Sequence, residues 1–248
     1  MLLTLDIGNT NIKSALYESG RLTEFNVHST VNNVVEHIEK ITFNEVAICS
    51  VNPPVEKVLA DNISVRTIKI FRASIQNKFN FKLNYKTPQT LGMDRVCSAV
   101  GALDIATKEK ALSNNQYLVT VDLGTATTIN VVSPTKEFLG GLIAPGMITM
   151  LNSLNEKTAQ LPFPELNNYD GLIGNSTNAS IISGVISATV GMIGETINQL
   201  GSENDQNLPL IFVTGGNAKY VLNYLKYKVL FEEALVLKGL KVIYDLNK

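Results

Sequence analysis

Two short segments combine an aspartate, a glycine and small polar side chains directly after an apolar, β-prone run. The first is Asp6-Ile7-Gly8-Asn9-Thr10, and the second is Asp122-Leu123-Gly124-Thr125-Ala126. The glycine allows a tight turn in which backbone N–H groups approach an anion. The first segment is followed by Asn11, which adds a further donor, and by Lys13, which adds a positive charge. This combination is suited to binding phosphate groups.

The two aspartates cannot donate hydrogen bonds when they are ionised, so beside phosphates they require a cation in between. Mg²⁺ suits this position because it is a hard ion that binds both carboxylate and phosphate oxygens. A single segment of this kind is also compatible with an ordinary hairpin that has an Asx-type turn. Two copies, with Asp6 and Asp122 each near the start of one half of the chain, favour a functional interpretation.

A third cluster, Gly92-Met93-Asp94-Arg95, precedes a predicted helix. Phosphoryl transfer needs positioning, charge stabilisation and one carboxylate that accepts the proton of the attacking hydroxyl. Asp94 is a candidate for that base, and Arg95 is a candidate bidentate clamp for a substrate carboxylate. The alternative is structural, with Asp94 as a helix cap and Arg95 as a solvated residue of the first turn.

Several common catalytic motifs are missing from the sequence. The glycine spacing from Gly141 to Gly146 is that of a P-loop, but Met147-Ile148 replaces the lysine and hydroxyl that such a loop requires. There is neither a G-x-G-x-x-G motif after a strand nor a G-x-S-x-G motif. We expect the only histidines, His28 and His37, to lie on the surface, which disfavours a histidine-based site.

The elements that position these clusters are predicted from an internal repeat. In each half, the Asp-x-Gly turn lies between two β-prone runs, the second being Ile12 to Tyr17 or Thr127 to Val132. Each half also has a later strand with a loop signal after it, Asn52-Pro53-Pro54 in one case and Gly215-Gly216-Asn217 in the other. Helices are predicted over Val31 to Ile41, Asp94 to Thr107, Asn178 to Leu200 and Ala218 to Lys226.

These patterns predict an α/β fold with two duplicated domains, each a mixed sheet flanked by helices. We place the first domain at residues 1–115 and the second at 116–248, with the boundary in the polar stretch Lys108 to Gln116. The last helix could pack back on the first domain.

Composition narrows the functional classes. With 45% hydrophobic residues among 248, the chain can bury a sizeable core, and its net charge of -1 argues against nucleic acid as a partner. Cys49 and Cys97 lie in apolar stretches, as expected for buried thiols in a reducing compartment. The N-terminus has no basic leader, so we expect a cytoplasmic protein. The uncharged stretch Gly171 to Gly194 is interrupted by polar residues, which favours a buried helix over a membrane span.

Together the motifs resemble the type III pantothenate kinases of the acetate and sugar kinase, Hsc70 and actin superfamily. The resemblance covers nearly the whole chain. Besides the two Asp-x-Gly segments and Gly92-Met93-Asp94-Arg95, the matching segments are Ser50-Val51-Asn52-Pro53-Pro54, Tyr85-Lys86-Thr87-Pro88, Gly140-Gly141-Leu142-Ile143-Ala144-Pro145-Gly146, Ala159-Gln160-Leu161-Pro162, Gly174-Asn175-Ser176-Thr177, Thr214-Gly215-Gly216 and Leu237-Lys238-Gly239-Leu240. It implies two actin-like, ribonuclease H-like domains and ATP-dependent conversion of pantothenate to 4'-phosphopantothenate, the first step of coenzyme A biosynthesis.

The resemblance also implies roles for individual residues. ATP is expected to bind Thr125 and the segment Asp6-Ile7-Gly8-Asn9-Thr10-Asn11-Ile12-Lys13, with Asp6 serving Mg²⁺ through phosphate. Asp122 is expected to bind a monovalent cation, K⁺ or NH₄⁺, which the family requires besides Mg²⁺.

For the acceptor, the resemblance implies Asp94 as the proton acceptor. Tyr85 and the residues Gly92, Met93, Asp94 and Arg95 would surround pantothenate. Thr177 would reach the pantothenate site of the other subunit of a homodimer.

Two positions depart from the family pattern. Met93 stands where a small residue is common and could reshape the pantothenate wall, and Asn130 stands where some relatives have aspartate and could weaken cation binding. Two other functions share the fold. One is a nucleotide-binding accessory or regulatory protein, which need not retain Asp94. The other is a sugar or acetate kinase, which gives Arg95 no role.

Overall fold

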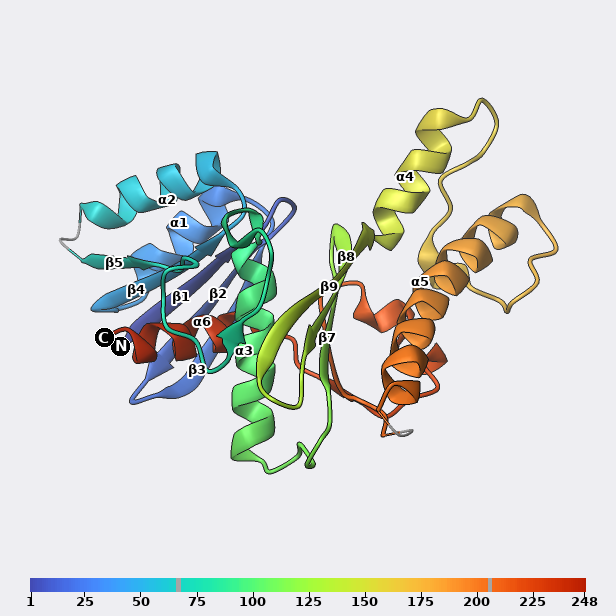
Figure 1. Cartoon of the computed structure of the whole chain (residues 1–248). Helices are drawn as coiled ribbons and strands as arrows, with labels where there is room; N and C mark the ends of the chain where they lie inside the picture. The colour runs from blue at the N-terminus through green and yellow to red at the C-terminus, as the bar shows by residue number, and fades with distance from the viewer. Residues whose placement is uncertain (66–67, 205–206) are drawn as a thin grey trace. The chain divides into compact units, whose positions relative to one another are not determined.

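The computed structural model describes residues 1–65, 68–204 and 207–248 and divides into two compact units (Figure 1). Unit 1 consists of Met1–Ala111, Lys136–Phe138 and Ala234–Lys248. Unit 2 consists of Leu112–Thr135 and Leu139–Glu233. Each unit contains a β-sheet with helices packed against it, so each can be described by itself.

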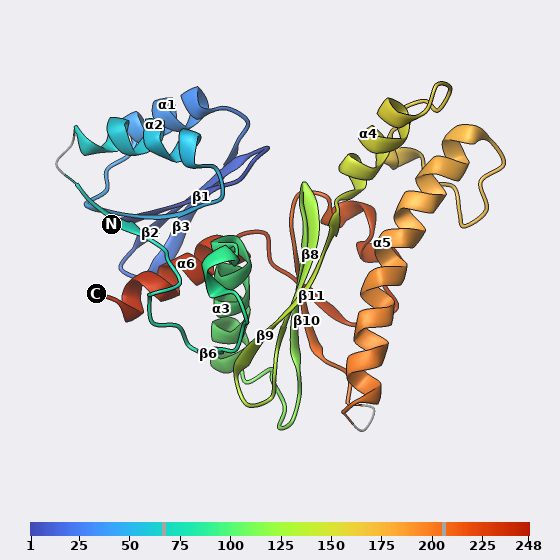
Figure 2. The same cartoon turned by 45° about the horizontal axis from the view of Figure 1, so that its top comes forward.

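Unit 1 is built on the five-stranded sheet β3-β2-β1-β4-β5, in which β1 is antiparallel to β2 and parallel to β4. Its helices α1 and α2 lie on one face of this sheet, and α3 and α6 lie on the other (Figure 2). The elements are β1 (Leu2–Ile7), β2 (Ile12–Glu18), β3 (Arg21–His28), α1 (Val31–Lys40), β4 (Glu45–Ser50), α2 (Pro53–Ser64), β5 (Lys69–Arg72), β6 (Lys82–Leu83), the 3-10 turn η1 (Pro88–Thr90), α3 (Met93–Lys108) and α6 (Leu235–Leu246).

The core of unit 1 explains why β1 is apolar almost throughout. Leu3, Leu5 and Ile7 point to one face of the sheet, where they join a buried cluster with residues of α1 and α2. Leu2 and Thr4 on the opposite face are also buried. A strand covered on both faces reads as a continuous apolar run, in contrast to the alternating pattern of a half-exposed strand.

Unit 2 contains the strand order β11-β10-β7-β8-β9, with β7 antiparallel to β8 and parallel to β10. The boundary between units falls within β9, whose first residues pair with β6 as part of unit 1. The elements are β7 (Leu118–Leu123), β8 (Ala126–Val132), β9 (Glu137–Pro145), α4 (Met147–Lys157), the 3-10 turn η2 (Leu166–Asn168), α5 (Thr177–Ser202), β10 (Leu210–Thr214), the 3-10 turns η3 (Ala218–Tyr220) and η4 (Leu222–Tyr224), and β11 (Val229–Phe231).

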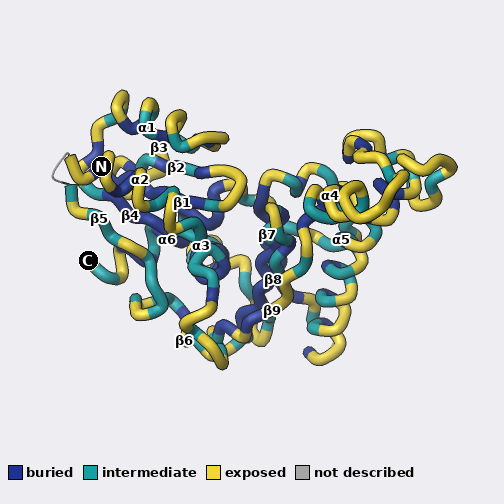
Figure 3. The backbone as a smooth tube through the Cα atoms, turned by 90° about the horizontal axis from the view of Figure 1, so that it is seen from above, coloured by how far each residue is buried: buried dark blue, intermediate teal, exposed yellow. Residues whose placement is uncertain are grey.

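The long helix α5 packs lengthwise on the core of unit 2. It is long and apolar enough to cross a membrane by length and composition, but half of its most apolar window is buried within the fold. Ile182, Ile186, Ile193 and Ile197 belong to the same buried cluster as the inner residues of β7, β8 and β10. Figure 3 shows β7 and β8 mostly in dark blue, the colour of buried residues, and the segments around α4 mostly in yellow, the colour of exposed residues. This packing is that of a core helix.

The α/β fold with two mixed sheets is confirmed, and three local expectations are wrong. Residues 218–226 form the two short 3-10 turns η3 and η4 where a helix was expected. Asn52-Pro53-Pro54 begins α2 instead of forming a loop: the Asn52 side chain accepts a hydrogen bond from Val55 N, and the two prolines occupy the first helical positions. Proline is favoured there because its missing N–H would have no partner within the helix.

The expectation that both histidines lie on the surface is wrong for His28. His28 is buried, and its Nε2 lies 2.9 Å from Ser14 Oγ on the neighbouring strand. Its ring centroid is 5.2 Å from that of His37, which approaches Glu24. Burial, followed by the nearby His37, lowers the pKa of His28. The sequence neighbours of His28 are polar and therefore give no sign that α1 covers the end of β3.

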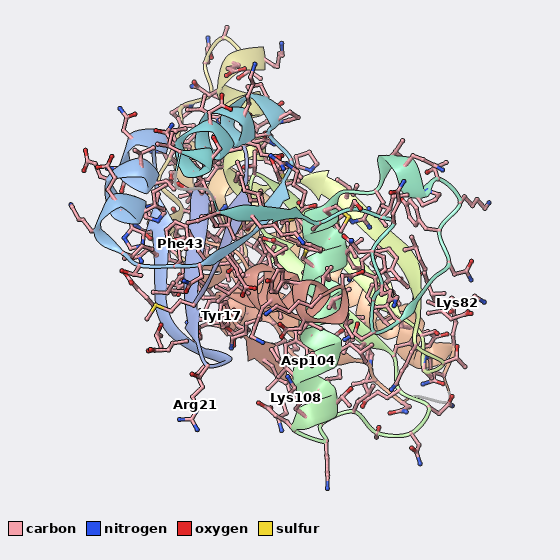
Figure 4. The ribbon with its side chains drawn as sticks, turned by 90° about the vertical axis from the view of Figure 1, so that its left-hand side faces the viewer. Tyr17, Arg21, Phe43, Lys82, Asp104 and Lys108 are labelled. Atoms are coloured by element: carbon pink, nitrogen blue, oxygen red, sulfur yellow. The ribbon has the colours of Figure 1, made fainter. Side chains whose placement is uncertain are left out.

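The helices α3 and α6 pack so closely that two glycines are required. A Cβ placed on Gly239 would lie 1.8 Å from the backbone oxygen of Cys97, and one on Gly101 would lie 2.6 Å from the backbone oxygen of Leu235. Because both obstacles are backbone atoms, no side-chain rotation can make room. The far end of α3 carries a surface ion pair, with Lys108 Nζ 2.7 Å from Asp104 (Figure 4).

This packing predicts that Gly239→Ala lowers the free energy of unfolding by about 3 kcal/mol, because the added methyl group forces the two backbones apart. Gly191→Ala on α5 is the matched control, since nothing lies within 4 Å of a Cβ there. The control is expected to stabilise the protein by up to about 1 kcal/mol through helix propensity. Urea unfolding measures both variants, and equal stabilities would contradict the packing argument.

The lowered pKa of His28 predicts that acid destabilises the fold. As the pH falls below about 6.5, the unfolded chain binds a proton at this position before the folded chain does, so stability is lost. His28→Gln cannot titrate and should lose less stability than the wild type between pH 8 and pH 5.5. Urea midpoints at the two pH values measure this difference, and an identical loss in both proteins would show that His28 is not responsible.

Candidate active site

The first Asp-x-Gly segment forms the tight turn between β1 and β2. Asp6 lies directly opposite Lys13 in the strand register, and Gly8 N donates to Asn11 O at 3.1 Å. A Cβ on Gly8 would lie 2.9 Å from that same oxygen, so the turn favours glycine. Buried Ile7 and Ile12 anchor the turn, whereas residues 9–11 are exposed to solvent. The geometry presents amide and hydroxyl groups next to a lysine, as phosphate binding requires.

Asp94 lies in the first turn of α3, whose N-cap is Gly92. The Asp94 side chain does not cap the helix from the N-cap position; its Oδ1 accepts from Arg95 N at 2.9 Å. Burial raises the pKa of Asp94 above 3.8, and this outweighs the hydrogen bond and positive charge of Arg95, which lower it. Its carboxylate is thus a stronger base than that of an exposed aspartate.

Arg95 is buried, with 5% of its surface exposed. The structural alternative of a solvated first-turn arginine is therefore wrong. Its charge lies close enough to Asp94 to lower the pKa of that carboxyl group. A buried guanidinium is expensive unless it is paired or hydrogen-bonded. A buried, planar guanidinium group is suited to binding a carboxylate ligand.

Unit 1 brings Asp6 and Asp94 to the same neighbourhood. Cys49 lies beside Asp6 in the parallel register of β1 and β4, and its thiol is hydrogen-bonded to Cys97, one turn after Asp94 on α3. The pKa of Cys49 is raised first by that hydrogen bond, then by burial, and further by the charges of Asp6 and Asp94. The first Asp-x-Gly turn and the candidate base thus lie around one buried thiol pair.

Tyr85 lies in unit 1 between β6 and η1. Its ring is 6.1 Å from that of Phe138, which stacks on Phe81 at 5.6 Å. Tyr85 is only partly buried, and Met93 opens α3 in the same unit. The aromatic cluster fixes the position of the Tyr85 ring.

The second Asp-x-Gly segment forms the turn between β7 and β8 in unit 2. Gly124 N donates to Ala126 O at 3.1 Å, and Thr125 is exposed. The end of β10 lies against this turn: a Cβ on Gly215 would be 2.6 Å from Asp122 Oδ1, and Gly215 has a φ of +97°. The site of Asp122 is thus closed on one side by backbone.

Asn130 is fully buried on β8. Its Nδ2 donates to Thr120 Oγ1 at 3.1 Å, across the pair of strands that carries Asp122. Asn130 thus pairs with Thr120 through a hydrogen bond between two neutral groups.

Thr177 is exposed at the first position of α5, in unit 2. It lines a cavity of about 1000 Å³ between α4 and α5. The same cavity is lined by Thr149, whose hydroxyl donates to Thr125 O at 2.6 Å. Thr149 thus lines the same cavity as Thr177 and also contacts Thr125, whereas the other predicted substrate residues belong to unit 1.

Among the described residues, no group of three or more His, Cys, Asp or Glu side chains is arranged to hold a metal ion. Mg²⁺ commonly needs only one or two carboxylates because it keeps waters and substrate phosphates as ligands. Asp6, at the start of the first Asp-x-Gly turn, fits that donor set. Two residues of this site were not predicted from the sequence: Thr149 and Asn217, which donate hydrogen bonds to the second Asp-x-Gly turn. The glycine pair Gly215-Gly216 predicts a turn but does not show what Asn217 contacts.

Solved structures with a similar fold extend over the whole chain. A proposed transcriptional activator of the Baf family from Campylobacter jejuni has a TM-score of 0.61 and 20% identity, with 98% of this chain and 97% of that one covered. A ROK family glucokinase from Streptomyces griseus, in complex with glucose and AMPPNP, has a TM-score of 0.51 and 14% identity over 96% and 97%. These likenesses show that the chain shares the fold of these proteins.

Sequence comparison gives the family. The family model for type III pantothenate kinase matches residues 2–199. Type III pantothenate kinases from Finegoldia magna and Thermosipho melanesiensis are each 31% identical, covering 100% and 99% of this chain and 98% of each relative. The enzyme from Flavobacterium psychrophilum is 30% identical over the full length of both chains. The chain belongs to the type III pantothenate kinase family, which confirms the resemblance found in its motifs.

Proposed function

We propose that this protein transfers the terminal phosphate of ATP to pantothenate, giving 4'-phosphopantothenate in coenzyme A biosynthesis, in the cytoplasm. Membership of the family supports the reaction. The single structural observation that carries the assignment of roles is the placement of Asp94. It is a partly buried carboxylate with a raised pKa, next to a buried arginine and in the same neighbourhood as the first Asp-x-Gly turn.

Asp94 acts as the general base. It accepts the proton of the pantothenate hydroxyl as that oxygen attacks the γ-phosphorus, while the bond from phosphorus to the β,γ-bridging oxygen breaks and ADP leaves. A base is most effective when its pKa approaches the working pH, and burial moves Asp94 in that direction.

The acceptor is held by groups of unit 1. Arg95 orients the pantothenate carboxylate, and Tyr85 with Gly92 and Met93 forms the surrounding wall. The burial of Arg95 supports this role, because a desolvated guanidinium gains most from a carboxylate partner. Neither a sugar nor a neutral acceptor offers that partner.

ATP is held by the two Asp-x-Gly turns. The segment from Asp6 to Lys13 binds its phosphates, and Thr125 contacts the nucleotide. Asp6 would hold Mg²⁺ beside the phosphates, and the ion would supply positive charge for the phosphoryl transfer. Asp122 would bind K⁺ or NH₄⁺, and the close approach of Gly215 to its carboxylate supports a site that backbone bounds on one side.

The protein acts as a homodimer in which Thr177 reaches the pantothenate site of the partner subunit. Thr177 is exposed, and the neighbouring loop carries Leu172 and Ile173 with 68% and 86% of their surfaces exposed. Apolar side chains gathered at such a position are typical of surfaces that are covered by a protein partner. Neither nucleic acid nor a membrane has a role in this function.

The function is tested by steady-state ADP formation with ATP, Mg²⁺ and a panel of acceptors, with and without K⁺. Pantothenate should be the preferred acceptor and K⁺ should raise the rate, whereas glucose and acetate should give no more than the background. A sugar or acetate kinase would reverse the acceptor preference. A nucleotide-binding regulator would bind ATP and show no acceptor-dependent turnover, and either result would sink the proposal.

Asp94→Asn is expected to lower kcat by about 10²- to 10⁴-fold, because the amide cannot accept the hydroxyl proton. ATP binding should be retained, since the substitution leaves the first Asp-x-Gly turn unchanged. Asp104→Asn is the matched control: it makes the same change on the same helix and removes only a surface ion pair with Lys108. Kinetics and isothermal titration with ATP measure both variants. Near-normal turnover of Asp94→Asn would place the base elsewhere.

A further inference from the structure

Asn217 makes two hydrogen bonds to consecutive carbonyl groups of the second turn. Its backbone N donates to Leu123 O at 3.0 Å, and its side-chain Nδ2 donates to Gly124 O at 3.2 Å. The preceding Gly215 allows this approach, because a Cβ there would lie 2.5 Å from Leu123 N. Gly216, between the two, has open space around it. Asn217 therefore grips the turn through both its main chain and its side chain.

The start of α4 holds the next carbonyl group of the same turn. Thr125 O accepts from Gly146 N at 2.9 Å and from Thr149 Oγ1 at 2.6 Å. A Cβ on Gly146 would lie 2.2 Å from Gly124 O, so backbone packs directly on backbone at this point. Three successive carbonyl groups are thus fixed by two segments that are distant in the sequence.

Fixing a carbonyl group also fixes the N–H of the next residue. The peptide unit is planar and trans, so its N–H points opposite to its C=O. With Gly124 O and Thr125 O held against η3 and α4, the N–H groups of Thr125 and Ala126 point away from those elements. A rotation of either peptide unit would replace a donor with an acceptor at that position.

We propose that Asn217 and Thr149 are positioning residues that set the orientation of the turn from Asp122 to Ala126 toward nucleotide and monovalent cation. The inference rests on the proposed function, which gives this turn its ligands. Neither side chain touches the reacting atoms; each acts through the carbonyl group that it binds. A single hydrogen bond of this kind corresponds to an effect of roughly three- to tenfold on an equilibrium.

Two isosteric substitutions remove the donors while keeping side-chain volume. Asn217→Asp places a carboxylate oxygen against Gly124 O, and Thr149→Val removes the hydroxyl that reaches Thr125 O. Thr149→Ser retains the hydroxyl and is the rescue variant. Asn155→Ala is the matched control, because Asn155 Nδ2 donates to Leu161 O at 2.9 Å on the far part of α4.

Asn217→Asp and Thr149→Val should each raise the Kd and KM for ATP roughly three- to tenfold. The K⁺ concentration for half-maximal activation should rise in parallel. The KM for pantothenate should stay within about twofold of the wild-type value, because the substitutions leave the pantothenate contacts of unit 1 unchanged. Thr149→Ser and Asn155→Ala should resemble the wild type in all four quantities. Thermal unfolding of every variant checks that the folded state is comparable.

Two outcomes overturn the inference. In one, Asn217→Asp and Thr149→Val bind ATP as tightly as Asn155→Ala does. In the other, the KM values for ATP and pantothenate rise equally and follow the loss of thermal stability, which indicates a structural role alone. ATP titration by calorimetry needs no turnover, so it decides the matter even where pantothenate is not phosphorylated. If pantothenate is not phosphorylated but both substitutions still weaken ATP binding, the proposed function is rejected and this inference stands.

Discussion

The close contact between α3 and α6 is the constraint on which the acceptor side of the site depends. Gly239 lies directly against the backbone of Cys97, so there is no room for even a methyl group between α6 and α3 at this point. Asp94 lies about one turn before Cys97 on the same helix, and Arg95 follows Asp94 directly. The thiol of Cys97 in turn meets Cys49, beside Asp6 on the sheet. Helix packing thereby sets the position of the candidate base relative to the first Asp-x-Gly turn.

Much of the fold could be predicted because its signals are local. An apolar run, a glycine and a second β-prone run specify each hairpin, and both occur at the expected positions, β1–β2 and β7–β8. The helices α1, α3 and α5 begin and end within two residues of their predicted bounds, since their caps and breakers are sequence neighbours. The ordered motifs predicted the family for the same reason.

The rest of the site could not be predicted because it depends on contacts between distant residues. The burial of Arg95 and His28 follows from what packs over them, and a polar neighbourhood in the sequence gives no sign of it. A helix was expected after Gly216, but this segment forms two 3-10 turns. Asn217 there binds Gly124, a partner about ninety positions earlier in the chain. Glycine signals a turn but does not identify what the turn contacts.

The central claim is that Asp94, with a pKa raised by burial, accepts the proton from pantothenate. The dependence of kcat/KM for pantothenate on pH tests it most directly, because this quantity reports the ionisation of essential groups in the free enzyme. We predict that kcat/KM rises with pH through an apparent pKa above the ordinary aspartate value of 3.8 and then levels off. A profile without that limb, or a limb that persists in Asp94→Asn, would contradict the claim.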